Sequence, residues 1–300
     1  MKRKRSSQRE YIQGLSKRTS LGLSILLTVL CVLSLLPFVL IASVSFSSER
    51  SIVNSGYRFL PEEWSLSAYQ YLFAHGKNLF FSFGVTVFIT AAGTVLSLLL
   101  ISTMAYALSQ KDFRFNVLFT LVVVIPMFFG GGLAASYTVN TQLYGLKNTI
   151  WALILPPACS GWYIMVMRTY LKSNISPEIL EAARLDGAST FCVFWRFVMP
   201  LSKPILIPIG IFEAFAYWNS WYENLLYTDS NHSKLFTLQY VLYNLEKNAS
   251  FLSSSERVSG MTSVQIPTES FRMALTVAII LPILVIYFLF RRHLERGVKI

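Results

Sequence analysis

One acidic residue lies in the middle of a long apolar stretch of this chain. Glu213 is nine positions after Pro204, a helical rise of about 14 Å, which places it near the centre of a bilayer. A carboxylate at that depth is costly and is functional by default. On a helical wheel Glu213 shares a face with Tyr217, Ser220 and Asn224, with Trp221 at its edge.

An aromatic ring beside hydrogen-bonding groups is suited to a sugar, because the ring stacks on the sugar and the polar groups meet its hydroxyls. This stripe and its neighbours Trp218 and Asn219 are therefore candidate substrate contacts. In the alternative, Glu213 pairs with polar groups of a partner subunit, and the aromatic residues form an interfacial belt. That belt consists of Trp218, Trp221 and Tyr222. The sequence leaves both alternatives open.

The rest of the chain offers no catalytic or metal-binding pattern. No G-x4-G-K-[ST] phosphate loop occurs. The glycines Gly130 to Gly132 lie in an apolar run with no preceding strand, so close helix packing or local unwinding explains them better than dinucleotide binding. Histidines and cysteines are scattered, which predicts no metal site. They are His75, His232, His293, Cys31, Cys159 and Cys192.

Composition indicates the elements that must position these residues. Only 14% of the 300 residues are charged, 54% are hydrophobic, and the net charge is +11, which argues against a soluble domain. The apolar residues form long runs of the length that a bilayer-spanning helix requires. We expect an all-α membrane protein with six spans, at Thr19–Ser48, Asn78–Gln110, Phe115–Leu146, Asn148–Met167, Pro204–Leu226 and Met273–Phe290.

Basic residues predict the orientation of these spans. Eighteen of the 26 Lys and Arg residues fall on one side, which the positive-inside rule identifies as cytoplasmic. We therefore expect a multi-pass protein of the cell membrane with both termini cytoplasmic. Topology and anionic lipid explain the basic amino-terminal run, so no nucleic-acid partner is expected. The predicted parts are a basic tail (1–20), a first span and outer loop (21–74), a five-helix domain (75–292) and a second tail (293–300).

One cytoplasmic segment, Lys172 to Lys203, is predicted to form two short helices joined at Gly187. Ser176 caps the first helix and Pro177 opens it. Ser189 or Thr190 can cap the second, which we expect to end before Met199–Pro200. The first helix presents four charged residues to the cytosol, Glu178, Glu181, Arg184 and Asp186. A rigidly held charged helix is a natural docking surface for a protein partner.

This segment resembles the EAA loop of ABC-importer permeases, whose pattern is EAA-x2-DGA-x8-I-x-L-P-x3-P. Its first half matches at every fixed position, and its second half has Phe197 and Met199 at the isoleucine and leucine positions. The match runs over Glu181-Ala-Ala-Arg-Leu-Asp-Gly-Ala188 and on to Pro200 and Pro204. Other stretches resemble MalG-like carbohydrate permeases, in particular the branch labelled YtcP or LplC. These stretches are Pro126-Met-Phe-Phe-Gly-Gly-Gly, Trp151-Ala-Leu-Ile-Leu-Pro, Met167-Arg-Thr-Tyr and Trp218-Asn219.

The resemblance implies an ABC transporter type-1 permease fold with a coupling loop at about 172–203 and an outer loop at about 227–271. It implies a homologous second permease, a dimer of ATPase subunits and an extracellular solute-binding protein as partners, with a carbohydrate as substrate. ATP and Mg would be held by the ATPase, and no cofactor by this chain. In the coupling loop Glu181 would engage the ATPase groove, and Asp186 and Gly187 would fix the turn. Ala182, Ala183 and Ala188 would permit close approach.

Three alternative functions remain for the chain. An importer of the same family could carry a peptide or an amino acid, and only the carbohydrate-like stretches argue against it. A secondary transporter would need an inverted repeat of spans and more intramembrane acids than Glu213. A membrane-embedded enzyme would need clustered carboxylates or an H-E-x-x-H helix, and the sequence contains neither.

Overall fold

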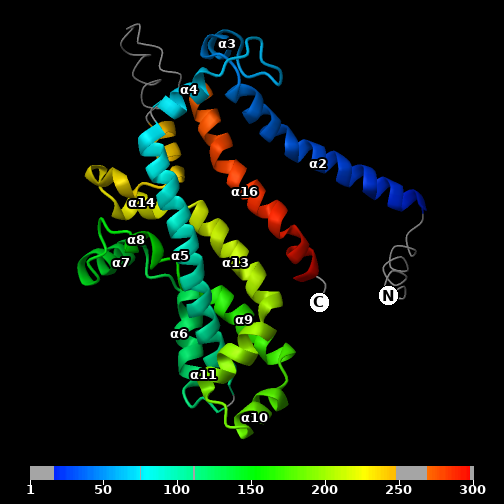
Figure 1. Ribbon diagram of the computed structural model, residues 1–300, viewed down its shortest axis with the longest axis vertical. Helices are drawn as coiled ribbons and strands as arrows, with labels where there is room; N and C mark the ends of the chain where they lie inside the picture. Colours follow the sequence, from blue (N-terminus) through cyan, green and yellow to red (C-terminus); the bar gives the residue numbers. More distant parts are fainter. Residues whose placement is uncertain (1–16, 75, 111, 248–268, 298–300) are drawn as a thin grey trace. The chain divides into compact units, whose positions relative to one another are not determined.

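The computed structural model describes residues 17–74, 76–110, 112–247 and 269–297, and these residues fold almost entirely into helices (Figure 1). They divide into two compact units. Residues 17–72 and 269–277 form the first unit, and residues 73–247 and 278–297 form the second. The predicted all-α fold is confirmed.

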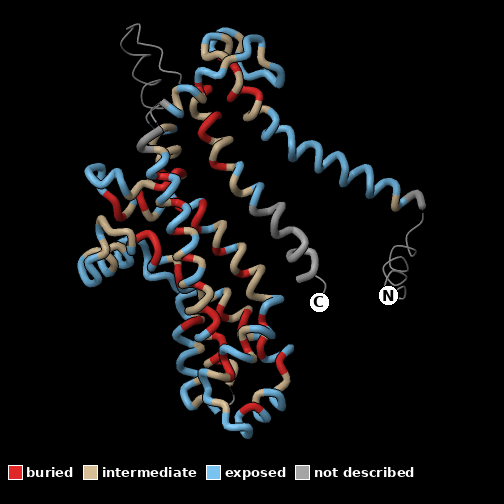
Figure 2. Tube along the Cα trace, viewed as in Figure 1, coloured by how far each residue is buried: buried red, intermediate tan, exposed pale blue. Residues whose placement is uncertain are grey.

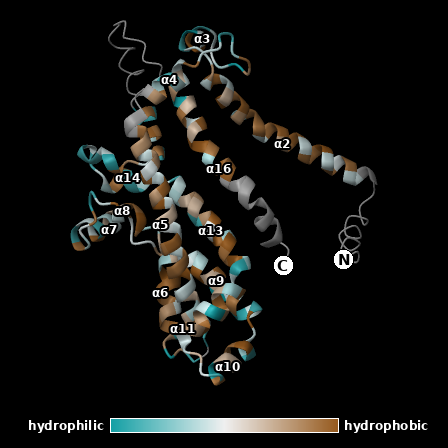
Figure 3. Cartoon of the chain, viewed as in Figure 1, coloured by the Kyte–Doolittle hydropathy of each residue, from teal (hydrophilic) through white to brown (hydrophobic). Residues whose placement is uncertain are grey.

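The first unit begins with α2 (Lys17–Ser45), a single long helix. Its stretch Thr19–Ser45 has a mean hydropathy of 2.9, and none of its most apolar window is buried against the rest of the chain (Figures 2 and 3). A helix that is apolar on all sides is suited to a membrane, where lipid or another helix can cover it. The chain then forms α3 (Glu49–Ser55) and α4 (Ser67–Ala74).

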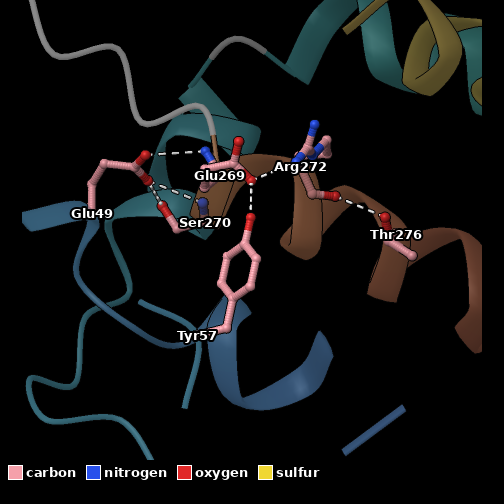
Figure 4. Close-up of polar contacts among 6 residues, drawn as sticks. All are labelled: Glu49, Tyr57, Glu269, Ser270, Arg272 and Thr276. Atoms are coloured by element: carbon pink, nitrogen blue, oxygen red, sulfur yellow. Dashed lines mark hydrogen bonds and ion pairs between the residues drawn. The ribbon is translucent and has the colours of Figure 1, made fainter. Parts of the chain in front are cut away.

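The start of α16 (Glu269–Gly297) is held in the first unit by a carboxylate from α3 (Figure 4). Glu49 accepts hydrogen bonds from the backbone N–H groups of Glu269 (3.1 Å) and Ser270 (3.0 Å), and from the Ser270 hydroxyl (2.8 Å). The first N–H groups of a helix have no partner within the helix, and its amino terminus favours negative charge. Glu49 therefore acts as a cap that is distant in sequence.

A tyrosine and an arginine extend this cluster (Figure 4). Tyr57 donates a hydrogen bond to the Glu269 carboxylate (2.7 Å), which also pairs with Arg272 at 2.5 Å. Burial, followed by the hydrogen bond to Glu269, raises the pKa of Tyr57. The phenol therefore stays a neutral donor across the physiological range.

Replacing Glu49 with alanine is expected to loosen the first turn of α16 by about 1–2 kcal/mol, the usual cost of a lost helix cap. Hydrogen exchange of peptides covering 269–277 measures this effect, and exchange should become roughly tenfold faster. Glu62→Ala is the control, because Glu62 belongs to an exposed ion pair with Arg58 in the same unit. Unchanged exchange in Glu49→Ala would contradict the capping role.

The second unit is built around α5 (Gly76–Ser109), against which α9 (Gly161–Asn174) and α13 (Lys203–Trp218) pack. The remaining elements follow in chain order: α6 (Asn116–Phe128), α7 (Leu133–Thr138), a π-helix (Val139–Leu143), α8 (Trp151–Ile154), α10 (Pro177–Leu185), α11 (Thr190–Val193), a second π-helix (Phe194–Val198), α12 (Met199–Leu201), α14 (Tyr222–Tyr227) and a 3-10 helix (Ser230–Leu235). Residues 238–247 are also helical. The buried residues concentrate where α5, α9 and α11 meet (Figure 2).

The α5–α13 contact depends on a glycine. A Cβ placed on Gly93 would lie 2.5 Å from Cζ of Tyr217. The Tyr217 side chain is almost fully buried, donates a hydrogen bond to the Ile154 carbonyl (2.8 Å) and shares another with the Ser97 hydroxyl (3.2 Å). Its ring therefore fills the space that a side chain at position 93 would need.

Six uninterrupted spans are not confirmed. Among the described residues, two helices are long and apolar enough to cross a membrane, in α2 and α5, or up to four if two bent pairs each count as one span. The predicted helix 115–146 bends by 119° between α6 and α7. The predicted helix 148–167 is interrupted between α8 and α9, where Pro156 and Pro157 lack the N–H groups that a helix needs. The helix predicted to reach Leu226 ends at Trp218.

Candidate functional site

The first helix of the predicted coupling loop is α10 (Pro177–Leu185), as the sequence indicates. Ser176 takes an extended conformation and Pro177 occupies the first helical turn. Ser176 occupies the predicted cap position, but its capping hydrogen bond does not form, because its hydroxyl donates to the carboxylate of Glu178 instead of accepting from the backbone. An acid in the first turn is favourable there because the amino terminus of a helix is positive.

A Schellman motif ends this helix and turns the chain. Gly187, where the two helices were predicted to join, has φ of +84°, a left-handed conformation that glycine adopts without steric cost. The N–H of Ala188 donates to the Ala183 carbonyl (3.0 Å), and the N–H of Gly187 donates to the Arg184 carbonyl (3.0 Å). These two bonds define the motif. The small side chain of Ala183 is buried in the core cluster, and Ala188 packs against that cluster.

The outward face of α10 combines charge with one large apolar side chain. Glu178, Glu181 and Ala182 are exposed, and Leu185 is 89% exposed. These positions share a face because they are three or four residues apart. Leu185 was not among the predicted site residues. The sequence signal that could have identified Leu185 is its position four residues after Glu181, which places both on one face of the helix.

The second helix of the loop runs further than predicted. Ser189 caps it by accepting a hydrogen bond from the N–H of Cys192 (3.3 Å). The helix then continues through α11, the π-helix Phe194–Val198 and α12 to Leu201, so the predicted end before Met199–Pro200 is wrong. The N–H of Met199 bonds to the Phe194 carbonyl, five residues back. This wider turn directly precedes Pro200, whose ring would clash with a regular preceding turn.

A polar network joins the helices beside α10. The Arg168 guanidinium donates to the carbonyl of Leu108 (3.0 Å) and to the side-chain oxygen of Asn116 (3.3 Å). Asn116 in turn donates to the carbonyls of Leu108 (2.9 Å) and Gln110 (3.2 Å). The Leu108 carbonyl at the end of α5 and the Gln110 carbonyl just after it are thereby satisfied by side chains of α6 and α9. Arg184 of α10 donates to the Gln110 side chain (2.6 Å), which ties α10 to the same end of α5.

The predicted substrate stripe does not form one helical face. The chain leaves helical geometry after Trp218, and α14 begins a new helix at Tyr222. Five of the seven candidate substrate contacts are buried within the chain: Glu213, Tyr217, Trp218, Ser220 and Asn224. Asn219 is exposed, and Trp221 is 38% exposed and stacks on Tyr243 with 4.6 Å between the ring centroids. A role for these residues in substrate contact stays a prediction.

Asn224 has a structural task that the sequence did not indicate. Its side-chain amide donates to the Leu235 carbonyl (2.9 Å), and its side-chain oxygen accepts from the N–H of Thr237 (3.0 Å). Asn224 thus fixes the return of the outer loop onto α14. The outer-loop residues 248–268 lie outside the described residues.

Comparisons with known protein families and with known sequences point to the same kind of protein. Residues 111–300 match the family described as binding-protein-dependent transport system inner membrane component. The chain is 33% identical to Protein LplC of Bacillus subtilis (strain 168), over 89% of this chain and 88% of that one. It is 31% identical to the polygalacturonan/rhamnogalacturonan transport system permease protein YtcP of the same organism, over 92% and 93%.

One solved structure is also similar. It is the crystal structure of a bacterial ABC transporter involved in the import of the acidic polysaccharide alginate. The TM-score is 0.78 with 27% identity, and the match covers 93% of this chain and 98% of that chain.

Proposed function

The chain belongs to the family of binding-protein-dependent transport system inner membrane components, and on this premise we propose that it forms part of the membrane pathway of an ATP-driven carbohydrate importer. It is a transport subunit and not an enzyme. The similarity to LplC and YtcP confirms the predicted resemblance to that branch. The names of YtcP and of the arabinooligosaccharide permease AraQ of Halalkalibacterium halodurans (29% identical) support a saccharide substrate over a peptide or an amino acid.

The geometry of α10 carries the proposed mechanism. A helix whose outward face bears Glu178, Glu181 and Leu185 is fixed at its carboxyl end by the Gly187 turn and tied to α5 through Arg184 and Gln110. A force applied to α10 is therefore transmitted to the longest helix of the second unit. We assign the docking partner as a cytoplasmic ATPase dimer, which would hold ATP and Mg.

The remaining parts of the proposal concern assembly. A homologous second permease would complete the pathway, and an extracellular binding protein would deliver the substrate. We propose six membrane crossings, some of them bent or interrupted, with both termini in the cytoplasm and a positively charged inner face; the hydropathy and the distribution of basic residues support this topology. In this topology the outer loop from about 227 to 271 faces the binding protein.

Reconstitution tests the function directly. The chain, its partner permease, the ATPase and the binding protein are placed in proteoliposomes, and uptake of oligosaccharides and of peptides is measured with and without ATP. We expect ATP-dependent uptake of oligosaccharide only. Peptide uptake, or oligosaccharide uptake driven by an ion gradient without ATP, would contradict the proposal.

Shortening Leu185 to alanine is expected to weaken ATPase binding by about tenfold, because an exposed leucine that becomes buried in an interface contributes roughly 1.5–3 kcal/mol. The measurement is the amount of ATPase that copurifies with the permease pair over a titration of ATPase concentration. Leu143→Ala is the matched control, since Leu143 is 72% exposed and lies on the π-helix after α7. Equal binding by both variants would exclude Leu185 from the interface.

A further inference from the structure

A cavity of about 530 Å³ lies in the second unit, between the α6–α7 connection and α14. The segments that line it lie on one side of α5, away from α10 (Figure 1). Its volume is in the range of about 300–1,000 Å³ that is usual for small-molecule sites. The lining residues discussed below are Gly130, Gly131, Ser136, Asn140, Tyr222 and Glu223.

The cavity is open because the residues of the α6–α7 connection that line it, Gly130 to Gly132, have no side chains. A Cβ added at Gly130 would meet no atom within 4 Å, and one at Gly131 would reach only the Cβ of Ala135, at 4.0 Å. Pro156 and Pro157 form another part of the lining and restrict the backbone there. The chain is not helical at these three glycines, and their missing side chains leave this part of the cavity unfilled.

Polar groups of the lining have unused hydrogen-bonding capacity. Glu223 accepts one hydrogen bond, from the Ser220 hydroxyl to Oε2 (2.6 Å), and within the described chain Oε1 accepts none. The hydroxyls of Ser136 and Tyr222 have no hydrogen-bond partner among the described residues. Asn140 donates to the hydroxyl of the buried Tyr227 (2.9 Å), which fixes one part of the lining.

The charge of the cavity is negative. Glu223 is its one ionisable acid, and none of the described lining residues is basic. A lysine lies close to the cavity in the chain: Lys147 precedes Asn148, whose N–H donates to the carbonyl of the lining residue Tyr227. This lysine is already paired with Asp229, at 3.2 Å. The side-chain amide of Asn148 lowers the pKa of Asp229, so this pair stays ionised near neutral pH. No described residue therefore neutralises Glu223.

Neutral sugar residues match this combination of groups. A carboxylate accepts strong hydrogen bonds from hydroxyls, and the Tyr222 ring, in a side chain 43% exposed, offers a face to the apolar side of a pyranose. A uronic acid residue would bring a second negative charge next to Glu223, which is unfavourable in a partly enclosed site.

We propose that this cavity binds one neutral sugar residue of the transported oligosaccharide, at a position separate from Glu213 and Tyr217, and that Glu223 selects against uronic acids. The inference rests on the proposed function and narrows its substrate class. It would distinguish this chain both from the importer of the acidic polysaccharide alginate and from YtcP, whose name gives a polygalacturonan, also a polymer of uronic acids.

The test uses the importer in nanodiscs without its binding protein, and saturation-transfer NMR. The probes are the methyl glycosides of glucose, galactose, mannose, rhamnose and xylose, and the methyl galactoside and galactosiduronate form a pair that differs only at C6. We expect at least one neutral glycoside to bind at millimolar concentration and the uronate to bind at least fivefold more weakly than its galactoside. Absence of all neutral binding, or equal binding of the pair, would overturn the proposal.

Two variants assign the binding to the cavity. Gly130→Leu fills the space from a position whose φ is not positive, so its backbone is not strained, and it should reduce neutral binding at least tenfold. Glu223→Gln keeps an acceptor and removes the charge, and it should raise uronate binding relative to the galactoside at least threefold. Wild-type behaviour of either variant would overturn the proposal. ATP-dependent uptake by the same wild-type importer would at the same time leave the proposed function intact.

Discussion

Replacement of Gly187 by valine is expected to abolish substrate-stimulated ATP hydrolysis and transport, while the protein still inserts into the membrane. At φ of +84° a β-branched residue is a steric outlier, with a cost of about 1–3 kcal/mol. The chain relieves this strain by leaving the left-handed conformation. The hydrogen bonds from Gly187 and Ala188 to the end of α10 are then lost, and α10 no longer has a fixed direction relative to α11.

The matched control is Gly56→Val. Gly56 ends α3 with φ of +72°, and a Cβ at either glycine would meet no atom within 4 Å. Both variants therefore place a β-branched residue at a positive φ. Gly56, with ψ of −168°, lies in a region that is almost restricted to glycine, so the control strains its own site at least as strongly. ATPase stimulation in proteoliposomes should fall to the basal rate in Gly187→Val and persist in Gly56→Val. Asparagine tolerates this conformation, so Gly187→Asn should recover part of the activity. Normal uptake by Gly187→Val would exclude the turn from coupling.

A methyl group at Gly93 is expected to destabilise the second unit strongly. Its Cβ would lie 2.5–2.7 Å from three ring atoms of Tyr217, and hydrogen bonds to Ile154 and Ser97 prevent the ring from moving aside. Overpacking of this kind costs about 1–3 kcal/mol, which corresponds to a fall in melting temperature of about 3–10 °C. Thermal unfolding of the purified importer measures it.

Gly84→Ala is the control on the same helix, and it is not expected to destabilise the second unit. Nothing lies within 4 Å of a Cβ at Gly84, and alanine favours the helix by about 0.5–1 kcal/mol over glycine. This variant should be neutral or slightly stabilising. The double variant Gly93→Ala/Tyr217→Leu should lose less stability than the sum of its parts, because the smaller side chain vacates the contested space. Additive effects would mean that the two residues do not compete.

The conformation of the segment proposed as the coupling loop could be predicted from sequence because its determinants are local. The cap at Ser189, the proline that opens α10 and the left-handed Gly187 each depend on residues within one helical turn. The fixed spacing of Glu181, Asp186 and Gly187 added the family resemblance. The extent of the second helix was mispredicted at Pro200, since a π-turn before the proline absorbs the clash that would otherwise end a helix.

The spans were less predictable because hydropathy measures how apolar a run is and not whether its backbone stays helical. The break after Trp218 separates Glu213 and Tyr217 from Ser220 and Asn224, so a helical wheel across it places them wrongly. Asn224 shows why: its side chain is fixed by hydrogen bonds to Leu235 and Thr237, which are more than ten residues away in the sequence and cannot be read from a helical wheel. The cavity could not be predicted at all, since it is made by segments 130–140, 156–157 and 222–227.

The cap that Glu49 provides to α16 has a consequence for the order in which the protein is made. The carboxylate and the N–H of Glu269 are 220 positions apart. At about 5–20 residues per second, a ribosome needs roughly 10–40 s to synthesise that interval. The first unit therefore cannot close as it emerges, because Glu49 meets its partners only after the start of α16 has been synthesised. A chain truncated before Glu269 would therefore leave the amino-terminal unit incomplete as well.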